Sequence, residues 1–259
     1  RTMIDKFGLN QTWSGIVMAL DNIMAVILLP LFGALSDKSN AKKGRRTPYI
    51  IVGTIIAAFA FMALSFGDYR QTILIEQTDI VSEHYDIAFD PEADHYESAH
   101  WYLVVDIMTD ERNDKFLSGD LSQSHLTRWE ETIKDPMINI LDDSQGTLDN
   151  RELSLIKDYY YTYLSERAWE VTSGDTTNLF IFGFFLFIAL VAMATFRSPA
   201  VSLMPDITLK PLRSKANAII SFMGATGGIL AFYVIMLSGL NRHAYDDHVF
   251  VYLAIGMIM

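Results

Sequence analysis

Residues 33–48 read G-A-L-S-D-K-S-N-A-K-K-G-R-R-T-P. This stretch lies between two apolar runs, residues 12–35 and 48–66, and each run is long enough to cross a bilayer. The stretch carries five cations, which are Lys38, Lys42, Lys43, Arg45 and Arg46. Short loops rich in lysine and arginine stay on the cytoplasmic side of a membrane, so we expect this loop to face the cytoplasm. Its placement sets the sidedness of every other segment.

Charge is distributed unevenly along the chain. The 259 residues have a formal charge of -11, but residues 68–175 hold 25 acids and 8 bases, whereas the rest of the chain holds 6 acids and 12 bases. The chain therefore combines apolar segments that have basic flanks with one long acidic insert. It contains no cysteine, which excludes disulfides and thiolate metal sites. The basic residues flank the apolar runs, so the sequence shows no basic patch of the kind that binds nucleic acid.

Two further apolar runs follow the insert, at residues 179–195 and 218–240, and a last one begins near His248 after an outer turn at 241–247. A second basic stretch lies between the first two of these runs and holds Arg197, Lys210, Arg213 and Lys215. Counting the crossings places both basic stretches on the cytoplasmic side and the acidic insert on the other side. We therefore predict an all-α membrane protein with an extracytoplasmic insert. The last run is about 18 Å long as a helix, too short for a core of about 30 Å, so we read the sequence as a fragment.

The insert, residues 68–177, is too polar for lipid but has regular patterns. Residues 72–75 and 101–107 are apolar runs of the kind found in strands, whereas 122–133 and 151–163 have the pattern of amphipathic helices. Aromatic residues are frequent in it, which disfavours disorder. We therefore predict a small α+β domain.

The spacing of the basic loop carries a resemblance to a known family. The pattern G-x-x-x-D followed by G-R-R resembles the loop between the second and third helices of major facilitator transporters. Six residues separate Asp37 from Gly44, and this spacing resembles the sucrose/proton symporters and the glycoside–pentoside–hexuronide:cation symporters. A second stretch, R-S-P-A-V-S-L-M-P-D-I-T at 197–208 and then L-R-S-K-A-N-A at 212–218, resembles the segment between helices four and five of the same group.

The resemblance implies a major facilitator helical bundle, of which this chain holds part of the N-terminal six-helix half. Residues 1–67 would hold helices two and three, 68–177 the insert, and 178–259 helices four, five and a truncated six. The implied function is secondary active symport of a sugar or glycoside with a cation, by alternating access in the plasma or inner membrane. The protein would then be no enzyme and need no cofactor besides the coupling ion. Its partners would be the sugar, the bilayer and the remaining helices of the full-length chain.

Charges at the basic loop are candidates for a gate. A carboxylate at a helix end can pair with a guanidinium or face a helix N-terminus, and such contacts exist in only one of two rocking states. The resemblance implies the same role, and we favour Asp37 and Arg45 over Arg46 and the lysines for it. The complete predicted gating motif is Gly33, Asp37, Gly44, Arg45, Arg46, Asp206 and Arg213. The alternative is that these charges only set the topology.

Asp21 is the strongest candidate for a site within the membrane. It lies sixteen positions before Asp37, which is about 24 Å along a helix and therefore inside the bilayer. An ionisable group there is costly unless it faces a cavity or a partner. We hypothesise that Asp21 binds the coupling proton or contacts sugar hydroxyls, with Asn22 beside it; the alternative is a structural hydrogen bond between helices. Arg197 could join this site as a buried pair, or snorkel to the interface.

The apolar run around Pro30 bears on the identity of the coupling ion. Sodium-coupled members of the resembled group carry two acids in this helix, and the second lies just before a proline. Here Leu29 precedes Pro30, and Ala25 lies four residues earlier. The sequence therefore favours H⁺ as the coupling cation.

Two patterns in the insert suggest metal sites. Residues 141–152 partly fit a calcium loop, with Asp143, Asp149 and Glu152 as the candidate ligands. Leu141 in the first ligand position cannot coordinate, so a helix beginning near Thr147 is the alternative. Histidines and acids also cluster at His84, Asp86, Asp90, Asp94, His95 and His100. We favour an exposed acidic surface over a metal site as the explanation of this cluster.

Two other functions are compatible with the sequence. A membrane receptor could bind a ligand with the acidic insert, and a lipid or drug transporter could share the same fold with a more apolar cavity. The sequence shows no P-loop, G-x-S-x-G, H-E-x-x-H or dinucleotide-binding glycine pattern, so it gives no sign of an enzyme active site.

Overall fold

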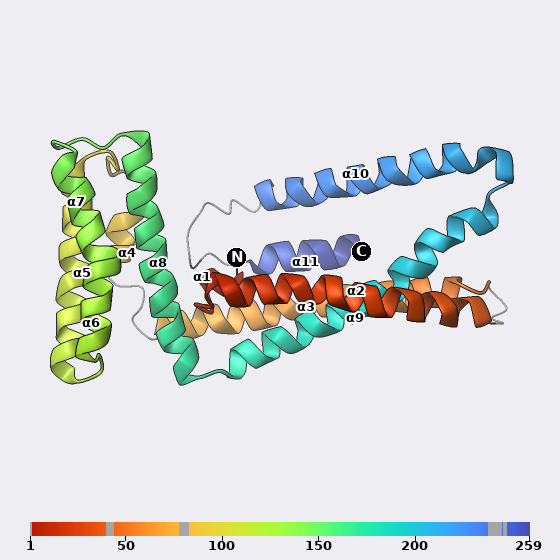
Figure 1. The fold of residues 1–259 in the computed structure, drawn as a ribbon, viewed down its shortest axis with the longest axis horizontal. Helices are drawn as coiled ribbons and strands as arrows, with labels where there is room; N and C mark the ends of the chain where they lie inside the picture. Colours follow the sequence, from red (N-terminus) through yellow and green to blue (C-terminus); the bar gives the residue numbers. More distant parts are fainter. Residues whose placement is uncertain (1, 40–43, 78–82, 238–244, 246–247) are drawn as a thin grey trace. The chain divides into compact units, whose positions relative to one another are not determined.

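A computed structural model describes residues 2–39, 44–77, 83–237, 245 and 248–259 (Figure 1). This part of the chain forms two compact units. The insert unit contains Met3–Gly8 and Ile73–Gly174, and the span unit contains Thr2, Leu9–Thr72 and Asp175–Met259. Two sequence expectations lie outside the described residues: the lysines Lys42 and Lys43 of the basic loop, and the outer turn at 241–247 apart from Tyr245.

Four described helices of the span unit are long and apolar enough to cross a membrane. They are α2 (Gln11–Lys38), α3 (Thr47–Gln77), α9 (Thr177–Ile207) and α10 (Arg213–Leu237), and the short helices of this unit are η2 (Lys210–Leu212) and α11 (Val249–Ile258). The short helix α1 (Thr2–Asp5) belongs, except for Thr2, to the insert unit. Asn10 caps α2, because its side chain accepts a hydrogen bond from the Trp13 amide at 3.0 Å. Pro48 lies in the first turn of α3, where a missing N–H has no cost. The prediction of a multi-pass helical membrane protein is confirmed.

Small residues let these helices approach one another closely. Helix α9 runs close to both α2 and α3 (Figure 1). A Cβ atom on Gly33 would lie 3.0 Å from Oγ of Ser198, and one on Gly53 would lie 2.8 Å from Cβ of Phe196. A Cβ on Gly256 of α11 would lie 2.7 Å from a side-chain carbon of α3. Close backbone contact of this kind is the usual way to pack helices in lipid, where no hydrophobic force drives association.

Two membrane helices are longer than the apolar runs that predict them. Helix α3 continues eleven residues beyond position 66, through the strand-like run 72–75, to Gln77. Helix α9 continues beyond position 195 to Ile207. The end of an apolar run marks the end of contact with lipid, whereas polar residues can continue the backbone hydrogen bonds of a helix beyond it. The hydropathy pattern therefore located the spans but underestimated their lengths.

The named elements of the insert unit are all helices within its described residues, and turns and short irregular segments connect them. Its helices are α4 (Glu83–Ala88), α5 (Ser98–Ser118), α6 (Gln123–Trp129), the π-helix η1 (Glu130–Lys134), α7 (Asp135–Asp143) and α8 (Asn150–Gly174). The amphipathic helices predicted at 122–133 and 151–163 are confirmed. An isolated bridge between Glu97 and Thr147 is the only β pairing in this part of the chain.

The predicted α+β character of the insert is wrong, because the strand-like run 101–107 belongs to α5. The buried residues there are Trp101, Val104, Val105 and Met108, which are spaced i, i+3, i+4 and i+7. That spacing is the helical period, whereas a strand would bury every second residue. The apolar run is therefore the buried stripe of a helix, and it packs into a core with the buried side chains of Trp129, Ile133, Met137, Tyr160 and Tyr163.

Candidate functional site

Arg46 joins the ends of three membrane helices. It immediately precedes α3, and its carbonyl accepts the first hydrogen bond of that helix from the Ile50 amide at 3.2 Å. Its Nη2 lies 2.7 Å from Oδ1 of Asp37, and its Nε lies 2.7 Å from Oδ2 of Asp206. Asp37 is the last residue but one of α2, and Asp206 the last but one of α9. We call Asp37, Arg46 and Asp206 the Arg46 clamp.

The electrostatics of the Arg46 clamp follow from its place at helix ends. Asp37 and Asp206 lie at helix C-termini, where the partial negative charge of the carbonyls opposes a carboxylate. The guanidinium of Arg46 offsets this repulsion at both positions, using two of its nitrogen donors. The Arg46 side chain is 13% exposed, but those of Asp37 and Asp206 are 59% and 54% exposed. Water therefore screens both ion pairs, and each contributes about 0.2–1 kcal/mol.

Two predicted glycines support the clamp through the backbone. Gly44 has φ +105°, a conformation that favours glycine, in the turn that brings the chain into α3. Gly33 allows α2 to approach α9 at Ser198, and its carbonyl accepts a hydrogen bond from Oγ of Ser36 at 2.8 Å. Both glycines of the sequence motif thus position the charged residues that follow them.

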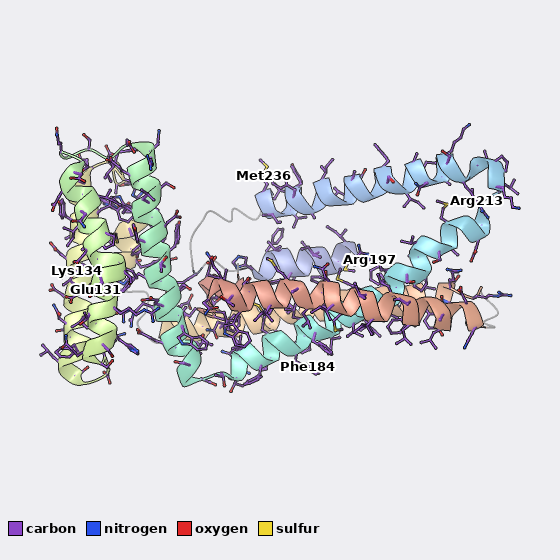
Figure 2. All side chains as sticks on the ribbon, in the orientation of Figure 1. Glu131, Lys134, Phe184, Arg197, Arg213 and Met236 are labelled. Carbon is purple, nitrogen blue, oxygen red and sulfur yellow. The ribbon has the colours of Figure 1, made fainter. Side chains whose placement is uncertain are left out.

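The structure separates the two adjacent arginines of the motif. Arg46 forms the clamp, whereas Arg45 is exposed, although the sequence interpretation had placed Arg45 ahead of Arg46. Arg213 is exposed at the start of α10, as Figure 2 shows. An arginine doublet gives no indication of which side chain points toward a neighbouring helix, because that depends on the turn between the helices. The gating role of these residues stays a prediction.

The structure does not bring the predicted coupling residues together. Asp21 is half-buried in the middle of α2, and its carboxylate has no hydrogen bond or ion pair with a described residue. Asn22 beside it is exposed, as is Arg197 on α9 (Figure 2). Helix α9 meets α2 with Ser198 against Gly33. Gly33 lies twelve residues after Asp21, which corresponds to about 18 Å, so Arg197 lies near the level of the Arg46 clamp.

The calcium-loop candidates act as helix caps. Oδ1 of Asp149 accepts hydrogen bonds from the amides of Arg151 and Glu152, each at 2.7 Å. Oε2 of Glu152 accepts one from the Asp149 amide at 2.8 Å. This reciprocal pairing is a capping box at the start of α8. Asp143 ends α7, so the alternative of a helix start near this position holds and the calcium-loop interpretation is not supported.

The histidine cluster also separates in three dimensions. His84 is buried in the core of the insert unit, whereas His95 pairs with His100, with Nδ1 to Nε2 at 3.3 Å. Within the described ranges no three histidine or acidic side chains form a group that could hold a metal ion. The density of these residues in the sequence therefore does not correspond to a metal site in this part of the structure.

We expect Asp149→Ala to destabilise the insert unit by about 1 kcal/mol, because it removes one half of the capping box. We also expect millimolar Ca²⁺ to leave the unfolding temperature unchanged, because the carboxylates of Asp149 and Glu152 already accept backbone hydrogen bonds. Thermal unfolding of the chain with Ca²⁺ and with a chelator measures both effects. A rise in the unfolding temperature with Ca²⁺ that Asp149→Ala abolishes would restore the calcium interpretation.

The insert unit contains a charge network around two buried arginines that the sequence patterns missed. Glu111 of α5 accepts a hydrogen bond from Oη of Tyr163 at 2.9 Å and pairs with Arg167 of α8. Glu170 pairs with Nη1 of Arg167 at 2.7 Å and with Nη1 of Arg112 at 2.6 Å. Both arginine side chains are buried. The i, i+3 spacing of Arg167 and Glu170 was a visible signal, but such pairs usually lie on solvated helix faces.

Comparison with known proteins gives this geometry a context. Residues 3–72 match the family model of MFS/sugar transport proteins. This segment is therefore similar to the MFS/sugar transport family. The match covers α2, the basic loop and α3 as far as Thr72, and so includes Asp37 and Arg46. Asp206, the third residue of the Arg46 clamp, lies outside the matched residues.

Two proteins that are similar to part of this chain are transport proteins by name. The general alpha-glucoside permease of Schizosaccharomyces pombe is 25% identical over 82 residues, which are 29% of this chain and 15% of the permease. The sucrose transport protein SUC3 of Arabidopsis thaliana is 30% identical over 64 residues, which are 25% of this chain and 11% of that protein. The chain thus spans a small part of the length of both relatives. No solved structure matches it.

Proposed function

We propose that this chain is part of a secondary active transporter that moves a sugar or glycoside by alternating access. The observation that carries the proposal is the match of residues 3–72 to the MFS/sugar transport model. The two relatives, named for alpha-glucosides and for sucrose, support the same substrate class. Both names describe transport, which supports a function other than catalysis.

The Arg46 clamp would serve as one half of the gate. In alternating access, two helix bundles rock about a central site, so contacts at one membrane face must form and break in every cycle. A screened ion pair of about 0.2–1 kcal/mol suits this task, because it biases one state without locking it. Arg46 would hold the ends of α2, α3 and α9 together in the closed state. The exposed Arg45 and Arg213 would mainly set the topology.

Asp21 would bind the coupling proton. An ionisable side chain in the middle of a membrane helix is costly unless it faces a cavity or a partner, so half-buried Asp21 is a candidate for this function. Proton binding would remove this charge when the site changes its exposure from one face to the other. Asn22 is the neighbour that could contact substrate hydroxyls, and Arg197 would act nearer the clamp.

The same proposal sets the sidedness of the chain. The basic loop and the Arg46 clamp would face the cytoplasm, because short loops rich in lysine and arginine stay there. The acidic insert unit would then lie on the extracytoplasmic side of the plasma or inner membrane. Residues 1–67, 68–177 and 178–259 would be two spans, the insert, and two spans with part of a third.

Uptake by the full-length protein in proteoliposomes tests this proposal. Labelled sucrose and maltose are added outside, with the lumen more alkaline than the medium by one pH unit. We expect accumulation that a protonophore abolishes. Sugar uptake that does not depend on the pH gradient would contradict proton coupling but would still support sugar transport. No uptake of either sugar under any gradient would contradict the transporter and favour a receptor or a lipid or drug transporter.

A further inference from the structure

The segment before the first span is packed against the insert unit. Residues Met3–Gly8, which include all of α1 except Thr2, belong to that unit. The side chains of Lys6 and Phe7 are completely buried. The carbonyl of Ile4 accepts a hydrogen bond from Oγ of Ser165 on α8 at 2.9 Å. We call Met3–Gly8 the strap.

Gly8 brings the strap into backbone contact with α8. A Cβ atom on Gly8 would lie 2.5 Å from Cα of Trp169, and closer still to the Trp169 amide nitrogen and the Ser165 carbonyl oxygen. The φ angle of Gly8 is +65°, a conformation that residues with a side chain rarely adopt. Its amide also donates a hydrogen bond to the Ile4 carbonyl at 3.0 Å. Both the space and the backbone conformation therefore require glycine at this position.

Helix α1 depends on this contact for its order. It has four residues, and an isolated helix of that length is not stable in water. The buried side chains, the hydrogen bond from Ser165 and the backbone contact at Gly8 supply the missing stabilisation. The strap lies within the residues 3–72 that match the MFS/sugar transport model, whereas α8 lies outside them. A segment similar to transport proteins is thus attached to the insert.

The strap leads directly into the first span. Only Leu9 and Asn10 separate Gly8 from Gln11, the first residue of α2, and the side chain of Asn10 caps that helix. Three steps of about 3.8 Å between successive Cα atoms keep Gln11 within about 11 Å of Gly8. The start of α2 can therefore move farther from α8 only if the strap detaches or if the insert unit moves with it.

Two other spans are also connected to the insert unit along the chain. The end of α3, Ile73–Gln77, is part of that unit. Helix α8 is followed by α9 after Asp175 and Thr176, and Oδ1 of Asp175 accepts a hydrogen bond from the Thr177 amide at 3.0 Å. Helices α2, α3 and α9 are thus connected to the insert unit at one end. The Arg46 clamp joins the same three helices at their other ends.

We propose that the strap is the interaction site through which the insert unit holds the start of α2, so that α2, α3 and α9 are tied together at both ends. A helix that is fixed at one end only can tilt independently of its neighbours. With both ends fixed, the three spans move as one group, and the insert unit moves with them. A consequence for the rate of transport rests on the proposed function, but the attachment of the strap does not.

Backbone hydrogen exchange of the full-length protein in lipid nanodiscs, followed by mass spectrometry, tests this inference. Gly8→Ala places a Cβ against the backbone of α8, so the strap and the first turn of α2 should exchange about tenfold faster or more, the effect of an overpacked contact. The matched control is Gly15→Ala on α2, because an added Cβ there meets no atom within 4 Å. This control should leave exchange of the strap unchanged.

Ser165→Ala is a milder variant that removes one hydroxyl and preserves the packing of α8. It should increase exchange of the strap about fivefold, the effect of one hydrogen bond. Equal exchange of the strap in this variant, in Gly8→Ala and in Gly15→Ala would overturn the attachment. Faster exchange of the strap with an unchanged first turn of α2 would overturn its hold on that helix.

Sugar uptake in proteoliposomes tests the consequence for transport. Gly8→Ala should lower the initial rate of uptake about threefold, as expected for loss of a contact that couples two parts of a protein. Gly15→Ala should keep the rate. An unchanged rate in Gly8→Ala, with the strap detached by hydrogen exchange, would overturn this consequence. If the unsubstituted protein takes up neither sugar, the proposed function fails, and hydrogen exchange still decides whether the strap holds α2, because it requires no substrate.

Discussion

Arg46→Gln is expected to reduce the initial rate of sugar uptake by the full-length protein about tenfold. The substitution removes the cation from between Asp37 and Asp206 and leaves two carboxylates at helix C-termini. Two screened ion pairs of about 0.2–1 kcal/mol each, together with the repulsion they offset, amount to roughly 1–2 kcal/mol. A free-energy difference of that size between the two states of a gate changes the population of one state about tenfold. Proteoliposome uptake under a fixed pH gradient measures it.

Arg45→Gln is the matched control, because Arg45 is the neighbouring exposed arginine. This substitution should change the initial rate of sugar uptake by no more than about twofold relative to the unsubstituted protein, because substitution of an exposed charge usually has a small effect. The chain has no cysteine, so a single introduced cysteine would be its only thiol. Ser36→Cys places this thiol at a fully buried position beside the clamp, where it becomes reactive only when the clamp opens. Maleimide should label this cysteine faster when Arg46 is glutamine. Equal effects of the two arginine substitutions on uptake and labelling would rule out the clamp as a gate.

Asp21→Asn is expected to abolish proton-driven accumulation and to preserve exchange of sugar between the two sides. Asparagine has nearly the shape of aspartate but cannot bind and release a proton near neutral pH. A gradient of one pH unit can drive about tenfold accumulation with one proton per sugar, and the variant should reach no more than equal concentrations. Accumulation at steady state and counterflow of labelled sugar, measured on the same vesicles, separate the two steps.

The control for Asp21→Asn is Asn22→Gln on the exposed neighbouring position. This variant keeps an amide and should keep accumulation, although its affinity for sugar can change if Asn22 contacts the substrate. Accumulation with unchanged pH dependence in Asp21→Asn would show that Asp21 only makes a structural contact. The coupling group would then have to be sought elsewhere in the full-length protein.

The errors made from sequence share a physical cause. The run at 101–107 was interpreted as a strand because a short apolar stretch fits both a strand and the buried stripe of a helix, and the spacing of Trp101, Val104, Val105 and Met108 decides between them. The length of α3 was underestimated because hydropathy measures lipid contact and not helix continuity. In both cases the local pattern allowed two structures, and packing selected one.

The sequence by itself determined the four spans, the basic loop between the first two, and the glycines at positions 33 and 44, because hydropathy, charge and backbone conformation are local properties. Only the tertiary structure decided that Arg46 and not Arg45 joins Asp37 to Asp206, and that His84, Glu111 and Tyr160 meet in the core of the insert unit. These contacts link residues that are far apart in the chain. A side-chain hydrogen bond forms within about 3 Å and a narrow range of angles, so only the packing of whole helices brings such groups into reach.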